Sequence, residues 1–151
     1  MEPKYDCLLG LDCRTLLNDV TVQNNLVDLS YHLNILYSDI REIVYQEKNE
    51  ILKEKEVSIV LITKVLLGTL GCIPSYDRFF VNGIQKNDIT KNIYQLTSIK
   101  KSIYQLAEFY EKNRAIFEEV RASSNIDGKL PYPQMKLLDL GFWIIGSKNE
   151  K

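Results

Sequence analysis

Val57-Ser-Ile-Val-Leu-Ile-Thr-Lys-Val-Leu-Leu67 is the most apolar stretch of this 151-residue chain. A helix drawn over these residues is apolar on nearly every side, which is typical of a helix buried at the centre of a domain. The β-branched run at 57–62 also suits a buried strand. The chain has no second strand-like run to pair with it, so we predict a central helix over 57–67.

A long amphipathic helix is predicted before this stretch. Its aliphatic side chains recur at alternating spacings of three and four: Leu26, Leu29, Leu33, Leu36, Ile40 and Ile43. This spacing places all of them on one stripe of a helix. Asn24 or Asn25 is the predicted N-cap. Residues 5–20 fit either a short helix or a packed arm, with a break at Gly10.

A glycine-bearing turn, residues 68–74, follows the apolar stretch. Ser75 is predicted to cap a short helix over 76–81, with Asp77 in its first turn, where a carboxylate suits the helix dipole. Asn82 and Gly83 are expected to end that helix, because glycine tolerates the left-handed backbone of a helix C-terminus.

Two further helical regions complete the pattern. The first starts at Asp88 or Thr90, with a break near 97–98, and its stripe comprises Leu96, Ile99, Ile103, Leu106, Tyr110, Asn113, Phe117 and Val120. The second follows a loop at 123–133, begins near Pro133 and ends at about Ile145, leaving 146–151 as a frayed tail. We therefore predict a single all-α domain, 1–151, of four to six helices around the central helix.

Composition and charge narrow the function classes. The chain has 19 basic and 20 acidic side chains, so it lacks the basic excess that is usual in dedicated nucleic-acid binders. Its three cysteines, Cys7, Cys13 and Cys72, do not suit a disulfide framework. The N-terminus lacks a signal-peptide pattern, and no apolar run reaches the ~18 residues of a membrane span. We expect a cytoplasmic protein without membrane attachment.

Signatures of metal binding and catalysis are sparse. His32 is the sole histidine, and its spacing from the cysteines matches no zinc motif. Gly68 and Gly71 are not followed by the lysine and hydroxyl residue of a phosphate-binding loop. We predict no metal, no cofactor and no catalytic residue, and we favour a non-enzymatic protein.

Residues 71–83 form the most distinctive candidate site. They place Tyr76, Asp77 and Arg78 directly after a Gly-Pro turn. A carboxylate at a helix start can act as a general base or bind a cationic partner, and together with Asp139 these residues constitute the enzymatic alternative. We favour a structural role, with Asp77 complementing the dipole and Arg78 capping carbonyls of a neighbouring helix, because no second catalytic partner can be named.

The late motif Leu-Leu-Asp-x-x-x-Trp, 137–143, adds to this segment. Together with the apolar helix, the Gly-bearing turn and the Pro-x-x-Asp-Arg motif at 74–78, it resembles helix-hairpin-helix DNA-glycosylase-like proteins over about 56–83 and 131–146. The resemblance implies an all-helical packing and at most proximity to nucleic acid. Gly68-x-x-Gly71 stands where that family carries Gly-x-Gly, and the family's catalytic lysine and aspartate cannot be placed, so base-excision chemistry is not implied.

Basic and aromatic side chains gather in the region 86–114. The candidate contacts to a phosphate backbone or to bases are Lys100, Lys101, Tyr104 and Arg114. Such a mixture suits base stacking and phosphate contact, which makes nucleic-acid binding the alternative function. Glutamates interleave with these residues, and mixed signs along a helix usually mark a solvated face.

Binding of another protein is the function predicted first. The two long stripes have near-heptad spacing, and Asn113 interrupts the second, as a polar residue can when it fixes register. Nine tyrosines and five phenylalanines supply material for an interface, although most of the stripe area is expected to face the domain's own core. We predict a small regulator, inhibitor or accessory subunit, with a homodimer as one arrangement and with the candidate binding residues Tyr76, Asp77, Arg78, Lys100, Lys101, Tyr104 and Arg114.

Overall fold

The computed structural model describes residues 3–52, 55–90, 96–124 and 131–148. In these ranges every regular element is helical, and no strand occurs. The elements are the 3-10 turn η1 (Pro3–Leu8), α1 (Cys13–Asn18), α2 (Val20–Glu47), α3 (Ile59–Thr69), α4 (Arg78–Lys86), the 3-10 turn η2 (Leu96–Ser98), α5 (Ile99–Lys112), α6 (Arg114–Ser123) and α7 (Gln134–Ser147). The predicted all-α class is confirmed, and the α-helices of seven or more residues are α2 to α7.

α4 and α7 pack against each other at close range. A Cβ atom at Gly83 would collide with the backbone carbonyl of Phe142, and one at Gly146 would collide with the carbonyl of Phe79. Glycine at both positions is therefore what allows the two backbones to approach. Because this contact orders the end of the chain, α7 continues to Ser147, and the predicted frayed tail is wrong at 146–147. Residues 149–151 lie outside the described part of the chain.

A loop, rather than the predicted helix, occupies the centre of the body. All of residues 70–76, which join α3 to α4, are buried. In contrast, α3 buries only Ile62, Thr63 and Leu66, and Leu61 is 39% exposed. The prediction of a central helix buried over 57–67 is therefore corrected: the helix begins at Ile59 and is covered on one face. The strand alternative for 57–62 is also wrong, because 59–62 are helical.

Aspartates cap the helices at positions that differ from those predicted. α2 begins at Val20, six residues earlier than the predicted stripe, because Asp19 Oδ1 accepts hydrogen bonds from the N–H groups of Thr21 (2.8 Å) and Val22 (3.2 Å). The predicted cap at Asn24 or Asn25 is therefore wrong. The segment 5–20, predicted as a short helix or a packed arm, holds most of η1 and the whole of α1, and Gly10 lies between them in the left-handed region with φ of 59°.

The N-cap of α4 is Asp77. Its Oδ1 accepts hydrogen bonds from the N–H groups of Phe79 and Phe80, both at 3.1 Å. The predicted helix 76–81 with Ser75 as cap is therefore wrong at both ends. The helix runs through Asn82 and Gly83 to Lys86, because at Gly83 it is covered by α7.

The helical region predicted from Asp88 or Thr90 onward, with a break near 97–98, starts later than expected: residues 88–90 are not helical, α5 begins at Ile99, and α6 follows as a separate helix. Asn113 lies between α5 and α6, and its Nδ2 donates a hydrogen bond to the Phe109 carbonyl at 2.8 Å. The side chain that was predicted to fix a register thus helps to end a helix. The 3-10 geometry of η2 agrees with the predicted irregularity near 97–98, and residues 91–95 lie outside the described ranges.

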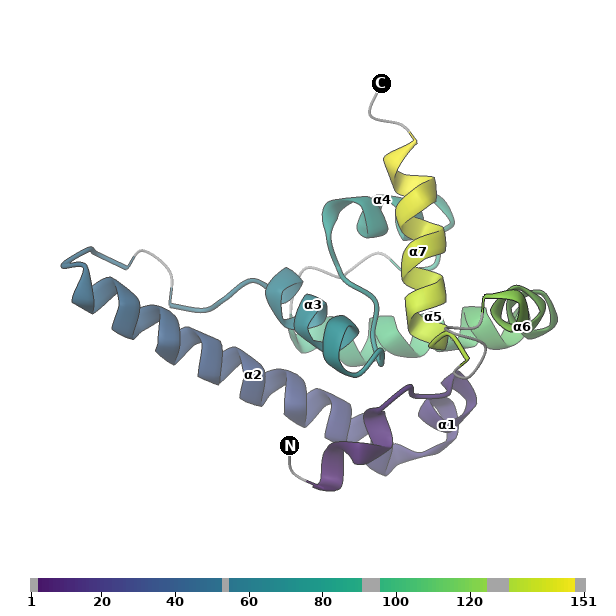
Figure 1. The fold of residues 1–151 in the computed structure, drawn as a ribbon, viewed down its shortest axis with the longest axis horizontal. Helices are drawn as coiled ribbons and strands as arrows, with labels where there is room; N and C mark the ends of the chain where they lie inside the picture. Colours follow the sequence, from purple (N-terminus) through teal and green to yellow (C-terminus); the bar gives the residue numbers. More distant parts are fainter. Residues whose placement is uncertain (1–2, 53–54, 91–95, 125–130, 149–151) are drawn as a thin grey trace.

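α2 has two unlike halves. Figure 1 shows its first half beside η1, α1 and α5, and its second half running past the body to a distant end. Val22 and Leu26 are buried in the first half, and Leu29 and Leu33 pack against the same core. The stripe predicted from the sequence is therefore one continuous helical stripe, but the core covers it only as far as Leu33.

Candidate functional site

The uncovered continuation of the α2 stripe is the principal candidate surface. It consists of Leu36 (52% exposed), Ile40 (45%), Ile43 (55%) and Val44 (39%), which we call the distal stripe. At about 100° of rotation per residue, the four side chains fall within about 100° of the helix circumference. Four large aliphatic side chains on one exposed face are unusual in a monomeric protein surface and are typical of an interaction site.

The chain that leaves α2 returns along the opposite face of the helix. Arg41 Nη1 donates a hydrogen bond to the Glu56 carbonyl at 3.1 Å, and the Arg41 guanidinium lies 5.8 Å from the Tyr45 ring centre. Glu42 pairs with Lys55 at 3.0 Å. These contacts hold residues 55 and 56 on a face of α2 other than the one that carries the distal stripe, whose four side chains stay exposed.

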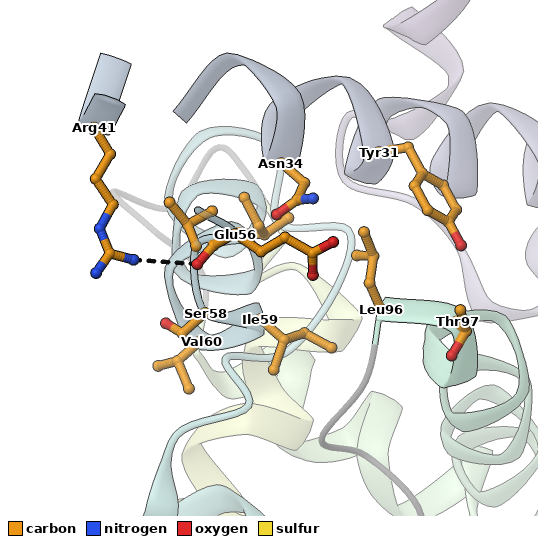
Figure 2. Close-up of a pocket in the computed structure, with 11 residues that line it drawn as sticks. Tyr31, Asn34, Arg41, Glu56, Ser58, Ile59, Val60, Leu96 and Thr97 are labelled. Atoms are coloured by element: carbon orange, nitrogen blue, oxygen red, sulfur yellow. Dashed lines mark hydrogen bonds between the residues drawn. The ribbon is translucent and has the colours of Figure 1, made fainter. Parts of the chain in front are cut away.

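A groove of about 710 Å³ lies on that opposite face, between α2, the start of α3 and η2. Figure 2 shows Tyr31 and Asn34 reaching into it from α2, and the Glu56 carboxylate extending between Asn34 and Leu96. Its lining is mixed, with apolar side chains from 57, 59, 60, 62 and 96 beside polar groups. No sequence pattern marked this groove, because its walls come from three separate segments.

The three consecutive residues Tyr76, Asp77 and Arg78 have separate surroundings. Tyr76 is buried, with its hydroxyl 2.7 Å from Ser102 Oγ, and burial raises the pKa of its phenol. Asp77 caps α4. Arg78 is exposed, and its guanidinium lies 5.0 Å from the Phe79 ring centre. Only Asp77 and Arg78 are therefore accessible to a ligand.

Asp139 on α7 supports the buried loop. Its Oδ1 accepts a hydrogen bond from the Ser75 N–H at 2.7 Å. Burial raises the pKa of Asp139 to about 6; the charge of Asp77 acts in the same direction, and the Ser75 N–H acts against it. The Tyr76 N–H likewise donates to Thr63 Oγ1 at 3.0 Å. Side chains thus satisfy loop N–H groups that have no helix or strand partner.

The predicted basic and aromatic residues are spread along α5 and α6. Lys100 Nζ lies 3.3 Å from Asn24 Oδ1 of α2, and Tyr104 and Lys101 are exposed nearby. Arg114 is distant from them, because about 18 Å of α5 separates Lys100 from Lys112. The Arg114 guanidinium binds the carboxylates of Glu111 (2.8 Å) and Asp12 (3.2 Å), so its charge is neutralised within the fold.

Arg114 belongs to a polar network that joins the start of α1 to α6 and α7. At its centre is the buried Gln134, whose Nε2 donates to Asp12 Oδ2 (2.9 Å) and Glu118 Oε1 (2.8 Å). Its Oε1 accepts from the Cys13 N–H at 2.7 Å. No sequence signal indicated Gln134, because its partners lie 16 to 122 residues away. The contacts of Arg114 with Glu111 and Asp12 therefore have a structural role in this network.

The histidine and the cysteines have separate surroundings in the described ranges. There, no group of three or more His, Cys, Asp or Glu side chains is placed to hold a metal ion. His32 Nδ1 lies 2.9 Å from the Tyr5 hydroxyl. Cys13 and Cys72 are buried, and burial raises the pKa of the Cys72 thiol to about 12. None of the helices described has the length and apolar character needed to cross a membrane.

Comparisons with known proteins returned no relative of this chain. No family model matches it, and neither a curated protein nor a solved structure matches it. The resemblance to helix-hairpin-helix DNA-glycosylase-like proteins stays a prediction.

Proposed function

We propose that this is a non-enzymatic binding protein that engages a helix of a partner protein through the distal stripe. A small regulator, inhibitor or accessory subunit fits this description. The observation that carries the proposal is the half-exposed state of Leu36, Ile40 and Ile43 on a helix that extends beyond its own core. Covering such side chains removes apolar surface from water, which is the main driving force of protein association.

The spacing of the distal stripe favours a helix as the partner element. Leu36, Ile40 and Ile43 continue the three-and-four spacing of the buried half of α2. Side chains at this spacing pack as knobs into the holes of a second helix. Fully burying an aliphatic side chain contributes about 1.5–3 kcal/mol, so completing the burial of four half-exposed ones contributes roughly 3–6 kcal/mol before the cost of association.

The two alternative functions draw less support from the geometry. For nucleic-acid binding, Arg114 is already paired with carboxylates, and it lies far along the helices from Lys100. For catalysis, Tyr76 is inside the core, and Asp77 and Asp139 serve as a helix cap and a loop support. The distal stripe needs neither of these sites.

Two substitutions on the same helix test the proposal. Ile40→Asp places a charge in the distal stripe at a position that is 45% exposed, whereas Ile35→Asp places one at a position that is 56% exposed and lies about 140° around the helix. Tagged wild type and both variants are used to recover proteins from lysate, with and without nuclease. We expect Ile40→Asp to lower recovery at least tenfold, Ile35→Asp to leave it unchanged, and nuclease to have no effect.

Folding of the variants is checked by thermal unfolding, which should be alike for all three, because both positions are exposed. Equal recovery by Ile40→Asp and wild type would contradict the proposal. Loss of recovery on nuclease treatment, together with a steep fall as salt is added, would instead support the nucleic-acid alternative.

A further inference from the structure

We draw no further inference here: the strongest candidate, the groove of about 710 Å³ between α2, the start of α3 and η2, is lined by the opposite charges of Arg41 and Glu56 beside apolar side chains, and nothing in the structure shows which ligand or partner fills it.

Discussion

The loop at 70–76 is buried, whereas the half of α2 that carries the distal stripe is exposed. This is the reverse of the usual locations of loop and helix. The loop has no regular hydrogen bonding, yet all seven of its residues are buried. The distal half of α2 is regular helix with an apolar stripe, yet Leu36 and Ile43 are more than half exposed. Loops ordinarily lie on the surface, because a buried one leaves backbone groups unpaired.

Side chains distant in the sequence form hydrogen bonds with the backbone of the buried loop. Asp139 and Thr63 accept its N–H groups, and the Gly10 N–H donates to the Leu70 carbonyl at 2.8 Å. Gly71 takes a left-handed backbone, with φ of 64°. The distal half of α2 satisfies its backbone internally and so needs no cover. A regular helix can therefore be exposed without leaving backbone groups unpaired. A loop can be buried where tertiary contacts pair its backbone groups.

The largest expected contrast is between two isoleucines. Ile73 in the loop is fully buried, whereas Ile40 on α2 is 45% exposed. Ile73→Ala should lower the free energy of unfolding by about 3 kcal/mol, because it leaves a cavity in the core. Ile40→Ala should change it by less than about 0.5 kcal/mol. Chemical denaturation of both variants measures the two changes in the free energy of unfolding. A larger change for Ile40→Ala than for Ile73→Ala would contradict the prediction.

The two glycines of α7 lie on different faces of the helix: Gly146 faces the backbone of α4, and Gly141 faces open space. Gly146→Ala should destabilise the protein by about 2 kcal/mol or more, because the added methyl group meets the backbone of α4. A Cβ at Gly141 meets nothing within 4 Å, so Gly141→Ala should stabilise the helix by about 0.5–1 kcal/mol. Thermal unfolding of both variants measures this. Similar shifts for the two would show that the α4–α7 contact is not close.

The smallest effect concerns the carboxylate that supports the loop. The pKa of Asp139 is raised to about 6 in the folded chain from the ordinary 3.8, so the folded state holds a proton that the unfolded state has lost. Stability should therefore fall as pH rises from about 4 to 6 and remain lower above that. Asp139→Asn keeps an oxygen acceptor for the Ser75 N–H but does not titrate.

Relative to wild type, Asp139→Asn should therefore gain on the order of 1 kcal/mol between pH 4 and pH 7, after allowance for solvent screening at this partly buried site. Denaturant unfolding of both proteins across that range measures the difference. A difference that does not vary with pH would show that Asp139 is an ordinary surface carboxylate, and the loop would then depend on its apolar packing alone.

Several elements could be predicted because their signals are local. The three-and-four spacing identified α2, and Pro133 with the preceding loop placed the start of α7. Asp19 and Asp77 are also local signals, since aspartate is a favoured N-cap, but they were missed because the helix starts were placed by apolar residues or by Ser75. The polar network around Gln134 and the Glu56-lined groove could not be predicted, because each joins segments far apart in the chain.

The sequence by itself determined that the chain is helical and that α2 carries one apolar stripe. These properties follow from side-chain periodicity and type. Only the tertiary structure decided that the stripe emerges from the core after Leu33, and that the loop at 70–76 lies inside. Periodicity fixes which side chains share a face, but burial depends on where the rest of the chain packs, and contacts such as that between Asp139 and Ser75 fix that packing.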